Sequence, residues 1–156
     1  MFVMKILLVS DSHGNEELLK KLVRQYPKMD YYLHVGDSGL DRDSLYPFES
    51  VRGNTDYYPF DELIRIYTPM GYLLIKHKPW FTNEQIKDNR FLINGHTHEY
   101  RIYSEGEKTF LNPGSLTLPR DGSNGTYMII EIENDKASII IYDIETKNVL
   151  IHEQIV

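Results

Sequence analysis

The sequence predicts an α/β fold in which two β-sheets pack face to face with helices outside. Three observations support this prediction. The first 35 residues are ordered strand, helix, strand, and the last third consists of short apolar runs between Gly, Asn, Asp and Lys turns. No linker, repeat or low-complexity tract interrupts the chain. We therefore predict a single domain over residues 1–156, a length at which roughly 70% of the unfolded surface is buried without staples.

The N-terminal part predicts a parallel crossover. Residues 4–9 are aliphatic except for Lys5, which is typical of a strand buried on both faces. Residues 16–26 then place acidic residues early, a leucine stripe along one face and basic residues late, and Pro27 ends this predicted helix. Residues 30–35 form the second predicted strand. We expect a right-handed connection, with ligands bound by the loops that follow both strands.

The rest of the chain predicts mainly strands. In the middle we expect one short helix at residues 83–89 and strands at residues 50–52, 64–67, 72–75 and 91–93. In the last third we expect strands at residues 101–103, 109–111, 127–133, 137–142 and 149–155. We interpret the strands of the last third as a second, mainly antiparallel sheet. Their exposed edges make a homo-oligomer one expectation.

Composition and charge exclude several classes of protein. The chain has no cysteine, which excludes a disulfide scaffold and leaves nitrogen and oxygen ligands for any metal. Its 17 basic and 23 acidic residues give a formal net charge of -6 without a basic cluster. Duplex nucleic acid and membranes are therefore not expected partners. The apolar run at residues 2–9 is too short for a membrane span or a signal peptide, so we expect a cytoplasmic protein.

Polar clusters follow five of the predicted strands. They are Asp11-Ser12-His13, Gly36-Asp37, Gly53-Asn54, His77 and Gly95-His96-Thr97-His98. Their nitrogen and oxygen donors suit divalent manganese, iron, nickel or zinc, and seven donors are enough for two ions if one carboxylate bridges them. The other two histidines have plainer interpretations. We take His34 as a hydrogen-bonded core or supporting residue and His152 as structural or exposed.

The order of these motifs resembles the calcineurin-like metallophosphoesterases. Within that superfamily the chain is similar to the small, single-domain phosphodiesterase group of bacteria and archaea, which is related to the retromer subunit of the same fold. Asn112-Pro113-Gly114-Ser115 looks like a further signature of this group. The resemblance implies a four-layer sandwich, two mixed β-sheets flanked by α-helices. It also implies a dinuclear metal site at the strand ends.

The resemblance further implies how the two divalent ions are held. One ion would be bound by Asp11, His13, Asp37 and His98, and the other by Asp37, Asn54, His77 and His96. Asp37 would bridge them, and we assign catalytic parts to Asp37, Asn54 and His96. Manganese is the expected metal, with nickel, iron or zinc as alternatives, and no organic cofactor is expected. Asp56, Thr97 or a nearby carbonyl would orient the histidines.

Such a site predicts hydrolysis of small phosphate esters. Two divalent ions outweigh the charges of two carboxylates and a bridging hydroxide, so the site attracts phosphate although the whole chain is acidic. The shared hydroxide can attack phosphorus in line with the leaving group. We therefore expect a metal-dependent phosphoesterase, and within this class a phosphodiesterase.

Two positions depart from the family pattern. Larger members carry a histidine after the Gly-Asn pair, whereas this chain has Thr55, whose hydroxyl is a poor general acid. A slower enzyme, or one that needs good leaving groups, is expected. Where the family often has Gly-His after the fourth motif, this chain has Lys78-Pro79; Lys78 either binds phosphate or is a solvated loop residue. The loop at residues 112–115 either cradles an anion, with Arg120 reaching a second phosphate, or supports the site as a turn.

Two other functions stay open. Thr55 and Lys78 favour a non-enzymatic scaffold on the same fold, whereas the complete donor set argues against it. A nuclease or cyclic-nucleotide hydrolase would use the same metals on another phosphodiester. Twelve tyrosines, many near the predicted strand ends, could then stack on a base, although such residues are more often strand and edge residues.

Overall fold

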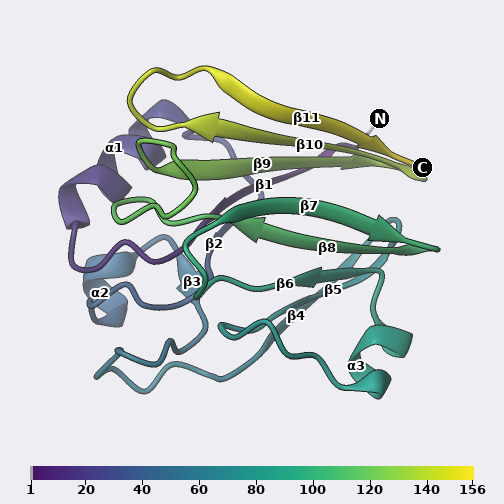
Figure 1. The fold of residues 1–156 in the computed structure, drawn as a ribbon, viewed down its shortest axis with the longest axis horizontal. Helices are drawn as coiled ribbons and strands as arrows, with labels where there is room; N and C mark the ends of the chain where they lie inside the picture. Colours follow the sequence, from purple (N-terminus) through teal and green to yellow (C-terminus); the bar gives the residue numbers. More distant parts are fainter. Residues whose placement is uncertain (1) are drawn as a thin grey trace.

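The computed structural model describes residues 2–156, which form two β-sheets packed face to face (Figure 1). The first sheet has the spatial order β11 (Val149–Ile155), β10 (Lys136–Asp143), β9 (Thr126–Glu133), β1 (Met4–Val9), β2 (Tyr31–His34) and β3 (Glu49–Ser50). The second has the order β4 (Ile64–Thr68), β5 (Gly71–Ile75), β6 (Phe91–Ile93), β8 (Lys108–Pro113) and β7 (Tyr100–Glu105). Both sheets are mixed, because β1, β2 and β3 pair in parallel, as do β5, β6 and β8.

Short helices flank the sheets, as predicted. Helix α1 (Glu16–Gln25) makes the β1-to-β2 crossover and begins where the Asn15 side chain accepts a hydrogen bond from the Leu18 amide. Helix α2 (Arg42–Leu45) is a single turn that packs with α1 over the six-stranded sheet. Helix α3 (Asn83–Asp88) starts with a capping box and lies beside the five-stranded sheet, where Gln85 binds Lys76. No helix in the described part of the chain is long and apolar enough to span a membrane.

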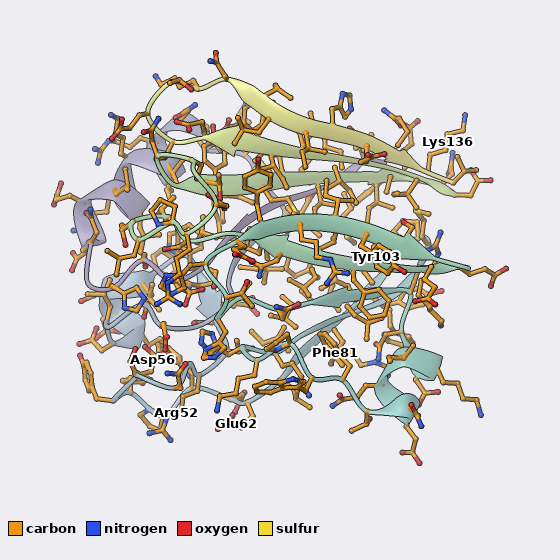
Figure 2. All side chains as sticks on the ribbon, viewed as in Figure 1. Arg52, Asp56, Glu62, Phe81, Tyr103 and Lys136 are labelled. Carbon is orange, nitrogen blue, oxygen red and sulfur yellow. The ribbon has the colours of Figure 1, made fainter. Side chains whose placement is uncertain are left out.

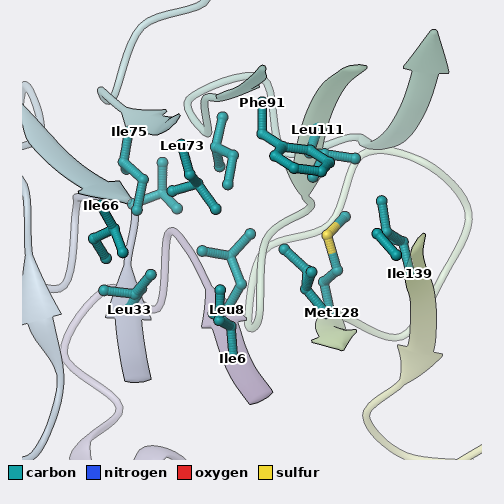
Figure 3. Packing of buried hydrophobic residues seen from close by; sticks show 14 of the residues in the cluster. Ile6, Leu8, Leu33, Ile66, Leu73, Ile75, Phe91, Leu111, Met128 and Ile139 are labelled. Carbon is teal, nitrogen blue, oxygen red and sulfur yellow. The ribbon is translucent and has the colours of Figure 1, made fainter. Parts of the chain in front are cut away.

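The main core lies between the two sheets. Figure 3 shows Ile6 and Leu8 of β1 facing Leu73 and Ile75 of β5, with Phe91 of β6 beside them. All five side chains are fully buried. Because this interlocking packing holds the sheets in one relative position, the loops after β1, β2, β5 and β6 meet at the same edge of the sandwich.

The expected strand positions are confirmed, but the assignment of the last third to one sheet is wrong. Strands β7 and β8 join the five-stranded sheet, whereas β9, β10 and β11 extend the six-stranded sheet through antiparallel pairing of β9 with β1. The reason is that β1 is a buried strand whose backbone N–H and C=O groups need partners along both edges, which β2 and β9 supply. Nothing in the local pattern of residues 126–155 states which distant strand they pair with.

Candidate metal centre

Asp11 lies at the centre of the polar cluster. It lies two residues after the end of β1 and is fully buried. One of its oxygens, Oδ2, accepts hydrogen bonds from the Ser10 hydroxyl at 2.5 Å and the His96 amide at 3.0 Å. The other oxygen, Oδ1, has no hydrogen-bond partner, and within residues 2–156 it is the only buried side-chain polar atom of which this is true. A buried, unpaired carboxylate oxygen is costly, and a bound cation removes that cost.

Histidine nitrogens surround this oxygen. The Nε2 atoms of His98, His13 and His77 lie 3.3, 3.9 and 3.9 Å from Asp11 Oδ1. Two groups have ligand atoms within 4.8 Å of one another: Asp11, His13 and His98, and Asp11, Asp37 and His77. Asp11 is common to both groups, whereas Asp37 belongs to the second only. The bridging role expected for Asp37 stays a prediction.

Asn54 and His96 complete the cluster. Asn54 Oδ1 lies 2.8 Å from His77 Nε2 and 3.0 Å from His96 Nδ1, while His77 Nε2 lies 3.3 Å from Asp37 Oδ2. The structure therefore brings all seven predicted donors to one edge of the two sheets. Donors from both sheets take part, because Asp11 follows β1 and His77 follows β5.

Backbone carbonyls orient two of the histidines. Nδ1 of His77 lies 2.7 Å from the carbonyl oxygen of Val35, and Nδ1 of His98 lies 2.7 Å from that of Leu118. Since a carbonyl can only accept, each ring donates through Nδ1 and directs Nε2 toward the other donors of the cluster, which is the usual support for a histidine ligand. Of the three expected supports, the nearby carbonyl is thus confirmed for these two rings.

Asp56 and Thr97 have other partners than the expected histidines. The Asp56 carboxylate accepts the backbone amides of Gly53, Asp37 and Gly39 at 2.7, 3.0 and 3.1 Å. It therefore holds the two metal-site loops together rather than a histidine ring. The Thr97 hydroxyl accepts a hydrogen bond from the Asn112 side chain at 2.9 Å.

The loop at residues 112–115 supports the site. The Ser115 hydroxyl donates to the Asp11 carbonyl at 2.7 Å, and the Gly114 amide is already bonded to the Asn112 side chain at 2.9 Å. Because the Gly114 amide already has a partner within the loop, it supports the site as part of a turn and does not cradle an anion. The Arg120 amide donates to the His98 carbonyl at 2.9 Å, and the Arg120 side chain is exposed.

The backbone of the cluster is strained. Five of the seven donors have positive φ: Asp11 (50°), His13 (44°), Asp37 (57°), His96 (70°) and His98 (62°). Residues other than glycine seldom adopt this conformation, and it concentrates at functional sites. Two of the motif glycines let the donors approach, since a Cβ on Gly53 would lie 2.1 Å from Asp37 Oδ1 and one on Gly36 would lie 2.6 Å from His77 Nδ1.

The charged groups shift one another's pKa values. Burial raises the pKa of Asp11. Burial is the largest single effect on Asp37 and His77 and opposes their charged forms, but the hydrogen bond between them, further hydrogen bonds from Thr55 and to Val35, and the neighbouring charges together outweigh it, so that the pKa of Asp37 is lowered and that of His77 raised. Burial, together with the charge of His77, lowers the pKa of His96. Asp37 and His77 therefore favour each other's charged forms, whereas burial opposes charge on Asp11 and His96.

The two histidines outside the cluster behave as expected. His34 is fully buried between the Ser12 hydroxyl and the Gly36 amide, and burial lowers its pKa to about 3. It therefore supports the first two motifs as a neutral ring. His152 is exposed on β11 and contacts Ser138. Sequence reasoning missed the contribution of Ser10, whose hydroxyl donates to Asp11. Its position directly before the first motif was the only signal in the sequence.

The family follows from comparison of the whole chain. Residues 4–135 match the model of the calcineurin-like phosphoesterase superfamily domain. The chain belongs to this superfamily. A "probable metallophosphoesterase" of Bacillus subtilis is 30% identical over 154 residues, covering 90% of this chain and 91% of that protein. The family resemblance expected from the motifs is therefore confirmed, and the matched region includes all seven donors.

Solved structures share the fold. An Escherichia coli phosphoesterase, YfcE, superposes with a TM-score of 0.77 at 23% identity, covering 98% of this chain and all of that one (100%). Vacuolar Protein Sorting 29 from Cryptosporidium parvum has the same TM-score, 0.77, at 20% identity, covering 99% of this chain and 98% of that one. The expected sandwich of two mixed sheets with flanking helices is confirmed.

Proposed function

We propose that the chain is a metal-dependent phosphoesterase that hydrolyses small phosphate esters, with phosphodiesters as its preferred class. The observation that carries this proposal is the unpartnered Oδ1 of buried Asp11, faced by three histidine Nε2 atoms. Membership of the superfamily supports it, as does the name of the Bacillus subtilis relative.

The seven donors fit two divalent ions. We propose Asp11, His13 and His98 for one ion and Asn54, His77 and His96 for the other, with Asp37 between them. Manganese is the expected metal, because the donors are a mixture of imidazole nitrogens and carboxylate or amide oxygens. Bound there, two ions would supply a hydroxide nucleophile and the positive charge that attracts a phosphoryl group.

The chain's own residues prepare this chemistry in three ways. The carbonyls of Val35 and Leu118 keep two histidine rings in the metal-binding orientation. The Thr55 amide donates to Asp37 Oδ1 at 2.9 Å and fixes that carboxylate. Asn54 and His96 lie at the more accessible side of the cluster, since Asn54 is exposed and His96 half-buried, so they are placed to contact a substrate.

The test is hydrolysis of bis(p-nitrophenyl) phosphate by the purified protein with manganese. We expect turnover in the wild type and its loss in Asp37→Ala. His98→Ala should also lose it, whereas the exposed His152→Ala, which lies far along β11, should keep it. Metal analysis of the same samples should give two equivalents in the wild type. Absence of metal-stimulated hydrolysis above the Asp37→Ala background would contradict the proposal.

A scaffold is the second candidate function. It is favoured by the fold shared with Vacuolar Protein Sorting 29, which is named for sorting rather than for hydrolysis, and by Thr55 where larger family members carry histidine. A scaffold would bind a stoichiometric partner equally well in the wild type and in Asp37→Ala. Assembly of copies into a homo-oligomer and a cytoplasmic location remain predictions.

A further inference from the structure

A cavity of about 580 Å³ opens directly beside the metal centre. It shares Asn54 and His77 with the donor cluster and continues past them to Arg52, Lys78 and Trp80. Figure 2 labels Arg52 among the residues between β3 and β4 that form one side of this cavity. We call it the Trp80 pocket. Its volume lies in the range of pockets that take ligands larger than one phenyl ring.

Trp80 lines this pocket and is largely exposed. It is the only tryptophan of the chain, it is 68% exposed, and its ring centre lies 6.4 Å from that of His96. A large indole left in water next to a reaction centre contributes little to the core. It is instead suited to stack on a flat ring of a bound molecule, as tryptophan does in nucleotide-binding proteins.

The Trp80 pocket is lined by more basic than acidic side chains. Arg52, Lys76 and Lys78 line it, and within residues 2–156 none of them forms an ion pair with a carboxylate. Two acidic residues, Asp56 and Glu62, also line the pocket, so that basic side chains exceed acidic ones by one. In a chain of net charge -6, a patch of this sign selects a ligand with negative charge beyond the phosphate at the metals.

We propose that the Trp80 pocket binds the nucleoside part of the substrate, and that the substrate class is short nucleotide phosphodiesters. The inference rests on the proposed function. A base stacks on Trp80, and the terminal phosphate of the same nucleotide meets Lys78 and Arg52. Water adds to the internucleoside phosphorus and the bond from phosphorus to the ribose 3′ oxygen breaks. That oxygen takes up a proton, so that two mononucleotides leave.

Binding can be measured without turnover, because Trp80 is the single source of tryptophan fluorescence. The probe is a 5′-phosphorylated adenine dinucleotide with a phosphorothioate linkage, titrated into protein that is already saturated with manganese. We expect saturable quenching by this dinucleotide and none by ribose 5-phosphate, which lacks the base. Equal quenching by ribose 5-phosphate, or no quenching by the dinucleotide, would overturn the inference.

Kinetics of variants supply the second readout. With the ordinary dinucleotide, Trp80→Ala should lower kcat/KM by about 5- to 100-fold, the range for loss of one stacked base, and Trp80→Phe should recover most of it. Tyr103→Ala is the matched control, because Figure 2 shows Tyr103 on β7, away from Arg52. An equal effect of Trp80→Ala and Tyr103→Ala would contradict stacking.

The role of the basic residues is tested with the same dinucleotide, with and without its 5′-phosphate. Lys78→Ala should reduce kcat/KM several-fold only when that phosphate is present, and Lys136→Ala, at the distant β9–β10 turn, should not. A loss independent of the 5′-phosphate would overturn the role of Lys78.

If the wild type hydrolyses bis(p-nitrophenyl) phosphate but neither binds nor cleaves the dinucleotide, the inference fails alone. If it hydrolyses no ester at all, the proposed function fails.

Discussion

At the scale of single residues, Asp11 and Asp56 show how two buried carboxylates in one loop cluster take different roles. Asp56 satisfies three backbone amides, while Asp11 leaves one oxygen without a partner. Asp11 follows the apolar run of residues 4–9, whereas Asp56 lies in a polar turn after Gly53-Asn54-Thr55, so the sequence separates the two residues but does not state which groups each carboxylate binds. The difference depends on which amides the fold brings within reach, which is a property of loops distant in the chain.

For Asp11→Asn we expect metal binding to be lost without loss of stability of the metal-free protein. The amide keeps an acceptor for the Ser10 hydroxyl and the His96 amide, and it removes an unpaired buried charge. In urea with EDTA, the free energy of unfolding should equal or exceed that of the wild type. Added manganese should stabilise the wild type alone. A variant that still gains stability from manganese would contradict the assignment.

Asp56→Asn should behave in the opposite way. One of the three backbone amides would face an NH₂ group in place of an oxygen, so the free energy of unfolding should fall by about 1–3 kcal/mol even with EDTA present. Urea unfolding measures this, with the exposed turn variant Asp135→Asn as control. If Asp56→Asn unfolds like the control, the carboxylate does not hold the two loops together.

Thr55 offers a gain-of-function test. Its backbone amide donates to Asp37 and is kept in any replacement, and the residue is exposed, so that this hydrogen bond to the carboxylate survives a change of side chain. Thr55→His would add a general acid, a group that raises the reaction rate by roughly 10²- to 10⁴-fold at an optimised site. We expect a smaller gain, confined to diesters with poor leaving groups. Steady-state kinetics of Thr55→His with alkyl and aryl diesters test this expectation. An equal change in kcat/KM for both kinds of diester would argue against an acid role for the new histidine.

At the scale of elements, the positions of the strands could be predicted but not all of their partners. The runs at residues 91–93 and 149–155 match β6 and β11 residue for residue, because apolar patterning and turn residues act locally. The pairing of β9 with β1 joins segments more than a hundred residues apart and depends on which edge of β1 remains open. The positive φ of five donors was equally hidden, since it follows from the packing of loops.

Gly53, the glycine of the third motif, allows a prediction about how two loops pack. Gly53 lets the loop after β3 lie against the loop after β2, and a Cβ there would meet Asp37 Oδ1 and the Asp37 backbone nitrogen. Gly53→Ala should therefore displace Asp37 and lower manganese affinity at least tenfold. Isothermal titration with manganese measures this. Gly106→Asn, in the open β7–β8 turn, is the control, because nothing lies within 4 Å of its Cβ position.

At the scale of the whole molecule, the donor cluster connects the two sheets. Asp11 and Asp37 follow β1 and β2 of the six-stranded sheet, whereas His77 and His96 follow β5 and β6 of the five-stranded sheet. Away from this edge the sheets are held by the apolar core and by a few polar contacts, such as the hydrogen bond from the Arg90 side chain to the Val156 carbonyl. The convergence of distant motifs could be predicted from their order after strands, because parallel strand ends meet at one edge.

Metal removal should therefore lower the stability of the whole fold. A ligand present at a hundred times its dissociation constant stabilises the native state by about 2.7 kcal/mol, which for a domain of this size shifts Tm by about 5–10 °C. Calorimetry of wild type with manganese and with EDTA should show this difference. The shift should vanish in Asp11→Asn and persist in His152→Ala, because His152 lies on β11 and contacts no donor.

Since bound ions would link donors from both sheets, amide exchange in the loops after β5 and β6 should become faster when EDTA is added. Unchanged exchange there would show that the core alone fixes the sheets.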